Sequence, residues 1–161
     1  MFHRLRCLSR FDLGRGFLLP GRLPRIVLAD ALRWEPDAPF DAVLLDAPCT
    51  ATGTCRRHPD VLHRIGPRQI AEMVELQQAL LARAADWVKQ GGQLVYAVCS
   101  LEPAEGEEEA AQLGLTSDPI RVEELPAGIA PGAEGLLRTD PGMLVEHGGL
   151  DGFFIARWRR D

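Results

Sequence analysis

Two cysteines stand directly after apolar stretches of the sequence, and both stretches are typical of buried strands. Cys49 is the last residue of the segment DAPC, which follows residues 41–45, and Cys99 follows residues 93–98. In an open α/β sheet, ligands and chemistry gather at the carboxyl ends of the strands. We therefore expect both thiols to face one crevice, and a pair of thiols beside the Asp46 carboxylate suggests covalent chemistry.

The cysteines have other interpretations. A free cysteine is more often a small buried hydrophobe than a nucleophile, and we adopt that interpretation for Cys7 and Cys55. A metal site built from Cys49, Cys55 and His58 fits no common spacing of ligands, so we expect no metal. A thiol redox protein that uses Cys49 and Cys99 is disfavoured, because neither residue lies in a Cys-x-x-Cys motif.

The elements that would position the thiols alternate between strand and helix signals from Arg25 onward, which is typical of a doubly wound α/β domain. One apolar run ends at Asp30 and another at Asp46, so both acids are expected at strand ends. Pro67 suits the first position of a helix. The apolar spacing that follows predicts a helix that Gly91 and its neighbouring glycine bring to an end.

The second half of the sequence predicts more strands than helices. Residues 93–98 form a continuous apolar strand, and Pro103 opens an acidic helix that runs to about Leu113. Further strands are expected at residues 120–124, 136–138 and 152–158. The sequence therefore predicts parallel strands with an antiparallel C-terminal addition.

Composition places the chain among ordinary globular proteins. Its 161 residues suit one domain, with 46% hydrophobic and 25% charged residues. No apolar core follows the first arginines as in a signal peptide, and no apolar run approaches the roughly 18 residues of a membrane span. The net charge of −5 is unlike that of a protein that coats nucleic acid. We expect a cytoplasmic protein with reduced thiols and no membrane contact.

Three segments of the chain together resemble the RNA 5-methylcytosine methyltransferases; they are DAPCTATGT at residues 46–54, RRHPD at 56–60 and YAVCSL at 96–101. The bacterial ribosomal-RNA branch, of the RsmB/Sun type, is the most similar. The resemblance runs from about Arg25 to Arg160 and includes the closing DGFFIA. It implies an incomplete Rossmann-like class I methyltransferase sheet, with residues 25–161 as its C-terminal part and residues 1–24 unassigned and poorly ordered.

The resemblance implies a covalent mechanism on cytosine. Because carbon 5 of cytosine is a poor nucleophile, such an enzyme adds a thiolate to carbon 6, after which carbon 5 can accept a methyl group. Cys99 is the implied nucleophile, and Cys49 helps to release it. Asp46 is expected to bond the pyrimidine near nitrogen 3 and to stabilise the charge that develops there. DNA 5-methylcytosine methyltransferases instead use the Pro-Cys cysteine as nucleophile, so the second motif at Cys99 points to RNA.

The family's cofactor is S-adenosylmethionine, and the implied contacts are Asp30, Asp46 and Pro48. Asp30 matches the acid that reads the adenine amino group, although a solvated strand-end acid is the alternative. The family also cradles the methionine end on a glycine-rich turn after the first strand. Gly16 does not supply that turn, because only thirteen residues separate it from Asp30, whereas one βαβ unit takes about 30.

The missing strands have a structural consequence in the family's sheet. The first of them would lie beside the strand that ends at Asp46, and the second would separate that first strand from the strand that ends at Asp30. The strand that ends at Asp46 is therefore expected to have an exposed edge, through which the chain could associate. We therefore expect the C-terminal part of a longer enzyme, with an N-terminus that is truncated, mis-started or decayed.

Arg56, Arg57 and His58 form a polar patch in residues 47–66, which have the composition of a loop. Such a patch could hold RNA phosphates and keep an extruded base near the thiols, since chemistry on a base requires it to leave the stack. The alternative is a solvated loop in which Asp60 pairs with a nearby arginine.

The sequence therefore predicts an S-adenosylmethionine-dependent RNA cytosine carbon-5 methyltransferase that acts on ribosomal RNA through a covalent Cys99 adduct. The alternative is a non-catalytic remnant or RNA-binding module without a complete cofactor site.

Overall fold

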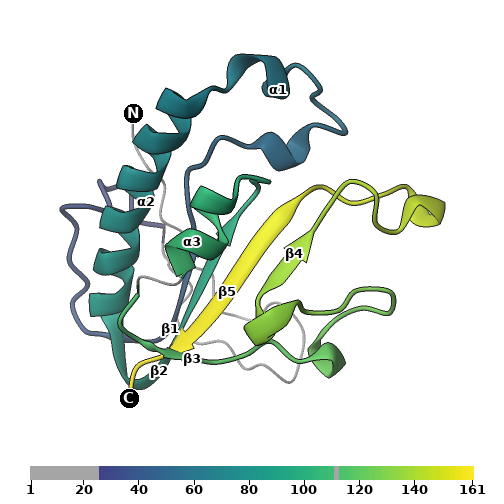
Figure 1. Cartoon of the computed structure of the whole chain (residues 1–161). Helices are drawn as coiled ribbons and strands as arrows, with labels where there is room; N and C mark the ends of the chain where they lie inside the picture. Colours follow the sequence, from purple (N-terminus) through teal and green to yellow (C-terminus); the bar gives the residue numbers. More distant parts are fainter. Residues whose placement is uncertain (1–25, 111–112) are drawn as a thin grey trace.

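The computed structural model describes residues 26–110 and 113–161, which form one mixed sheet with helices packed against it (Figure 1). Across the sheet the order is β1 (Phe40–Asp46), β2 (Val88–Val98), β5 (Phe153–Arg159) and β3 (Thr116–Ser117), and β4 (Leu137–Thr139) also pairs with β5. The helices are α1 (Val61–Arg64), α2 (Pro67–Trp87) and α3 (Glu107–Ala110). Because β1 and β2 are parallel and the other pairings are antiparallel, the predicted fold class is confirmed.

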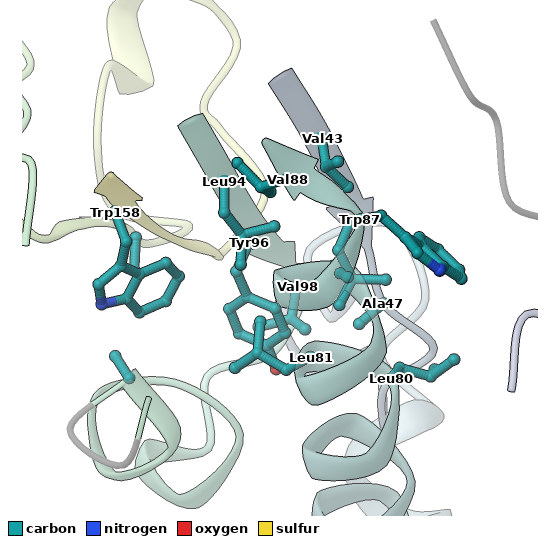
Figure 2. Close-up of a cluster of buried hydrophobic side chains, with 14 of the residues drawn as sticks. Val43, Ala47, Leu80, Leu81, Trp87, Val88, Leu94, Tyr96, Val98 and Trp158 are labelled. Carbon is teal, nitrogen blue, oxygen red and sulfur yellow. The ribbon is translucent and has the colours of Figure 1, made fainter. Parts of the chain in front are cut away.

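One face of the sheet carries the hydrophobic core. The strand register aligns two rows of buried side chains on that face, which are Val43, Leu94 and Trp158, then Leu45, Tyr96 and Ala156. Helix α2 covers them with Leu80, Leu81, Ala84 and Trp87. Figure 2 shows the labelled helix and strand side chains gathered into this cluster. Each fully buried Leu, Val or Phe contributes about 1.5–3 kcal/mol, so the core fixes how β1 and β2 lie together.

Helix α2 begins where the sequence predicts but ends earlier. Pro67 occupies its first turn, and the Gln69 side chain accepts a hydrogen bond from Gly66 N at 3.2 Å. The helix ends at Trp87 rather than at Gly91, and the following residues belong to β2. Val88 is 1% exposed and pairs with β1, so strand pairing and burial favour an extended backbone before the glycines are reached.

The predicted strand before Asp30 is wrong for residues 26–29, which have no regular structure. Ile26 and Leu28 are 88% and 75% exposed. Within the described residues, β1 is the outermost strand and nothing pairs with its outer edge, so the segment has no ladder to join. Asp30 instead caps a turn, since its carboxylate accepts a hydrogen bond from Leu32 N at 3.0 Å.

The acidic segment after β2 is less regular than expected. A 3₁₀ turn covers Pro103–Glu105, α3 follows, and the backbone breaks at Gly106 (φ −122°, ψ −100°). A side chain at this glycine would lie 2.5 Å from Arg138 Nη2. The glycine therefore allows close packing with Arg138, directly after the buried Glu105.

The C-terminal strands are confirmed at β4 and β5, but residues 120–124 do not form a strand. The sheet pairing falls at β3, and Val122–Glu124 is a 3₁₀ turn. Pro119 lacks the N–H that a further ladder bond needs, which explains why pairing stops before it. The expectation for residues 1–24 lies outside the described residues. No described helix is long and apolar enough to cross a membrane.

Candidate active site

The two strand-end cysteines meet at one end of the sheet. Asp46 is level with Ala97 in the parallel register, so the chain leaves β1 and β2 side by side. Cys49 Sγ and Cys99 Sγ are 3.5 Å apart, and both residues are partly buried. The structure therefore brings together the two thiols that the sequence singled out. Cys55 is also a free thiol, while Cys7 lies outside the described residues.

The pKa values of the two thiols are shifted in opposite directions. The pKa of Cys99 is lowered to about 7, mainly because the Cys49 thiol donates a hydrogen bond to it; burial and the nearby Asp46 carboxylate oppose the shift. The pKa of Cys49 is raised, first by that same hydrogen bond and then by burial. Cys99 therefore loses its proton more readily than Cys49, which favours Cys99 as the thiolate, the reactive form of cysteine.

Main-chain contacts join the cysteine loops to the start of β5. Gly53 N donates to Cys99 O at 3.1 Å, and Gly152 N donates to Gly53 O at 2.7 Å. A side chain at position 53 would lie 1.9 Å from Gly152 O. This close approach requires glycine, and it explains why the closing DGFFIA segment belongs with the cysteine motifs.

The implied cofactor residues are not gathered into one site. Asp46 is exposed at the end of β1, and Pro48 O accepts a hydrogen bond from Gln77 Nε2 at 2.8 Å. The Asp30 carboxylate caps its own turn and lies 3.7 Å from Arg33 Nε. No glycine-rich turn between a strand and a helix occurs in residues 26–110 or 113–161. These residues therefore do not form a complete site for S-adenosylmethionine.

The arginine patch is attached to the loop that precedes β5. Arg57 binds the Asp151 carboxylate through Nε at 2.9 Å and also through Nη2. Arg56 donates to Leu150 O at 3.2 Å. The Asp151 side chain is 11% exposed, and the Arg57 guanidinium holds the pKa of Asp151 below its usual range. The patch is therefore fixed in position, while Arg57 remains 54% exposed to solvent.

His58 and Asp60 complete the loop. His58 is exposed, and its backbone N donates to Thr54 O at 2.9 Å. Asp60 pairs with Arg64 at 2.9 Å, as the alternative interpretation of the loop predicts. Among the described residues, no group of three or more His, Cys, Asp or Glu side chains could hold a metal ion.

Sequence reasoning missed a buried polar network beneath the thiols. Glu105 is fully buried and bonds residues of both cysteine loops, supported by Gln77 and Arg138. The run of glutamates after Pro103 is typical of a solvated helix face that stabilises the helix dipole. The pattern therefore does not show that Glu105 points inward. The only available signal is proximity, since Glu105 follows Ser100 by five residues and a short turn can bring it back to the strand end.

The fold and the thiol pair define a class of protein: an α/β domain with two cysteines at the ends of adjacent parallel strands. Comparison with known proteins narrows this class. Residues 22–159 match the family model described as 16S rRNA methyltransferase RsmB/F. The chain therefore belongs to this family of RNA methyltransferases, whose cofactor is S-adenosylmethionine.

Individual relatives agree with this assignment. The chain is 37% identical over 124 residues to the ribosomal RNA small subunit methyltransferase B of Yersinia pseudotuberculosis. The aligned residues make up 77% of this chain and 27% of the relative. The chain thus spans about a quarter of the length of the curated relatives that it matches.

Solved structures give the same result. NSun6 from Pyrococcus horikoshii, solved with SFG, has a TM-score of 0.68 and 29% identity, over 84% of this chain and 34% of that one. A methyltransferase homologue from the same organism has a TM-score of 0.57 and 29% identity, over 78% and 40% of the two chains.

Proposed function

We propose that this chain carries the base chemistry of an RNA cytosine carbon-5 methyltransferase, with ribosomal RNA as substrate and Cys99 as nucleophile. The observation that carries the proposal is the approach of Cys49 to Cys99, whose sulfurs are 3.5 Å apart. The lowered pKa of Cys99 and the raised pKa of Cys49 support Cys99 as the thiolate. A hydrogen bond from a neighbouring thiol stabilises a thiolate. It therefore favours the thiolate form before the attack and again when the sulfur leaves.

In the first step, an electron pair of the Cys99 thiolate forms a bond to carbon 6 of cytosine. The π electrons between carbons 5 and 6 move into the ring, and negative charge collects near nitrogen 3. Asp46 ends β1 close enough to Cys99 to raise the pKa of that thiol. A proton shared between the Asp46 carboxyl and the ring near nitrogen 3 would neutralise the negative charge that develops there.

S-adenosylmethionine would supply the methyl group of carbon 5. Asp30, Asp46 and Pro48 are the residues of this chain implied to hold it, although they do not form its complete site. The remaining step is release, for which the proton on carbon 5 must leave. Once Cys99 is bonded to carbon, its negative charge and its hydrogen bond with Cys49 are gone, and the largest cause of the raised pKa of Cys49 goes with them. Cys49 can then lose its proton to water and become a base.

Release restores the starting state. The Cys49 thiolate takes the carbon-5 proton, the electron pair of that C–H bond re-forms the double bond between carbons 5 and 6, and Cys99 departs as thiolate. The hydrogen bond from Cys49 to Cys99 is thereby regenerated. Over the whole cycle, one proton passes from cytosine to solvent.

Arg56, Arg57 and His58 are proposed to hold the RNA backbone beside the thiols. Their loop follows Cys49 directly, and its attachment to Asp151 gives the positive groups a fixed place. Phosphate contacts of this kind position a nucleic acid without reading its sequence. An extruded cytosine could then reach the thiols while its strand stays bound.

A second function is favoured by one observation: the described residues do not form a complete cofactor site. On that account the chain is an RNA-binding module or remnant that retains the thiols without using them. Such a module would bind RNA but would form no bond to a base.

RNA that contains 5-azacytosine separates the two functions without a methyl donor. Its nitrogen at position 5 makes carbon 6 more electrophilic. The thiolate adduct takes a proton from water on that nitrogen, which slows its reversal. We expect the chain and its Cys49→Ala and Cys55→Ala variants to form a protein–RNA complex that survives denaturing electrophoresis. Cys99→Ala should form none. A complex that persists in Cys99→Ala, or no complex with the unaltered chain, contradicts the proposal.

A further inference from the structure

Beneath the thiol pair lies a carboxylate that is completely shielded from water. Glu105 is 0% exposed, and its charge is held by hydrogen-bond donors rather than by a cation. Its Oε1 accepts from Thr50 N at 2.9 Å and from Gln77 Nε2 at 2.8 Å. Its Oε2 accepts from the hydroxyls of Thr50 and Ser100. A buried charge is tolerated only when it is bonded in this way.

The donors show what this carboxylate holds together. Thr50 follows Cys49 in the chain, and Ser100 follows Cys99, so one side chain bonds the residues next to both thiols. The two hydroxyls are also 3.2 Å from each other. Glu105 is therefore a bridge between two loops that are fifty residues apart in sequence.

Glu105 itself is fixed from several elements. Tyr96 of β2 donates its hydroxyl to Glu105 O at 2.9 Å. Gln77 of α2 bonds both the Glu105 carboxylate and Pro48 O, each at 2.8 Å. On the other loop, Arg138 Nη1 donates to Ser100 O at 2.8 Å, and its remaining nitrogens bind Glu107. The bridge is thus part of the packed interior and not a surface contact.

We propose that Glu105 is the positioning residue of the thiol pair, and that its carboxylate sets the approach of Cys49 to Cys99. The chemical task of that pair rests on the proposed function, but its geometry does not. Glu105 has no place in the bond-making steps, because its oxygens are occupied by Thr50, Ser100 and Gln77.

The charge of Glu105 gives the inference a second readout. The groups that act on the Cys99 thiol are Cys49, Asp46, Glu105 and Arg57. The hydrogen bond from Cys49 lowers the pKa of Cys99, whereas the Glu105 charge raises it slightly. Removing only the charge of Glu105 should therefore lower the pKa of Cys99. Separating Cys49 from Cys99 should raise it.

Two substitutions separate spacing from charge. Glu105→Gln keeps the shape and removes the charge, so the pH midpoint for alkylation of Cys99 should fall slightly. Glu105→Ala removes the bridge, so Cys49 and Cys99 separate and the midpoint should rise. A purely structural role would give no such opposite shifts.

Disulfide formation measures the spacing directly. In a glutathione redox buffer, the ratio of intrachain disulfide to dithiol gives the effective concentration of one thiol at the other. With Cys7 and Cys55 replaced by Ala, we expect Glu105→Ala to lower this value by about tenfold or more, while Glu105→Gln stays near the parent. Mass spectrometry of the quenched mixture reports the ratio.

Glu109→Ala is the matched control. Glu109 is also a buried glutamate, at 2% exposed, and it lies four residues further along the same acidic segment. Its carboxyl hydrogen-bonds Gln78, so its loss should leave the thiol pair unchanged. Should Glu105→Ala not fold, Ser100→Ala removes one donor to the bridge and is expected to lower the effective concentration in the same direction.

Equal effective concentrations and equal alkylation midpoints in Glu105→Ala and Glu109→Ala would overturn the inference. The two proposals can fail separately. If azacytosine RNA bonds to Cys99 while Glu105→Ala leaves the pair unchanged, only the positioning role is wrong. If Glu105→Ala separates the thiols but no RNA adduct forms, the positioning role stands and the proposed function is wrong.

Discussion

The cysteine loops and the segment before Asp30 differ in how they are held. At the cysteine end, hydrogen bonds from the main chain and from Glu105 join the loops after β1 and β2. At the other, residues 26–29 have no regular structure, and the side chains of Ile26 and Leu28 lie in solvent. Both segments end or begin at acids that the sequence marks as strand ends.

The difference separates the two halves of the proposed chemistry. The thiols are positioned by β1, β2, β5, α2 and the acidic segment, all of which are described. The proposed cofactor contacts include Asp30, which does not end a strand in the described part of the chain. The elements that the proposed base chemistry needs are therefore all among the described residues, whereas those of a complete cofactor site are not.

The largest expected effect compares one leucine from each region. Leu94 is 0% exposed in the core row beneath the cysteine end, and Leu28 is 75% exposed. We expect Leu94→Ala to lower the free energy of unfolding by about 2–5 kcal/mol, because it leaves a cavity between β2 and α2. Leu28→Ala should stay within about 0.5 kcal/mol of the parent.

Urea denaturation followed by circular dichroism measures both values. Equal losses for the two leucines would mean that the segment before Asp30 is packed like the core. That result would remove the contrast between the two regions.

A smaller effect compares one arginine from each region. Arg57 is fixed beside the thiols by Asp151, whereas Arg33 is 88% exposed and lies 3.7 Å from Asp30. If the patch after Cys49 holds RNA, Arg57→Ala should reduce the slope of log binding constant against log salt by about 0.7, the value for one phosphate contact to a single strand.

Arg33→Ala should leave that slope unchanged, because the described contacts place Arg33 on the Asp30 turn rather than on the loop after Cys49. Fluorescence anisotropy with a labelled RNA at several salt concentrations gives both slopes. A larger change of the slope in Arg33→Ala than in Arg57→Ala would indicate that RNA binds beside the Asp30 turn rather than beside the thiols.

The sequence predicts the cysteine end well, because local patterns and spatial neighbours coincide there. Parallel strands bring their carboxyl ends to one edge, so two strand-end cysteines are expected to meet. The antiparallel pairing of β5 also follows from the Asp151 turn signal and the apolar run after it. Register, and hence the 3.5 Å approach of Cys49 to Cys99, depends on packing that a pattern does not encode.

The remaining differences arise where tertiary contacts override local preference. An apolar run such as residues 26–29 becomes a strand only if a partner strand is present. Val88 ends α2 early because its burial and pairing favour the sheet. Glu105 is one of several glutamates in sequence, and only the fold shows which of them is buried.

The most direct test of the account is the pH dependence of Cys99 alkylation by iodoacetamide, with and without Cys49. A thiol reacts as thiolate, so the rate rises with pH through the pKa of Cys99 and then levels off. In the parent chain the midpoint should lie at about 7. In Cys49→Ala it should rise, because the hydrogen bond that lowers the pKa of Cys99 is lost. An unchanged midpoint, or faster alkylation of Cys49 than of Cys99 in the parent, would contradict the assignment of Cys99 as the nucleophile.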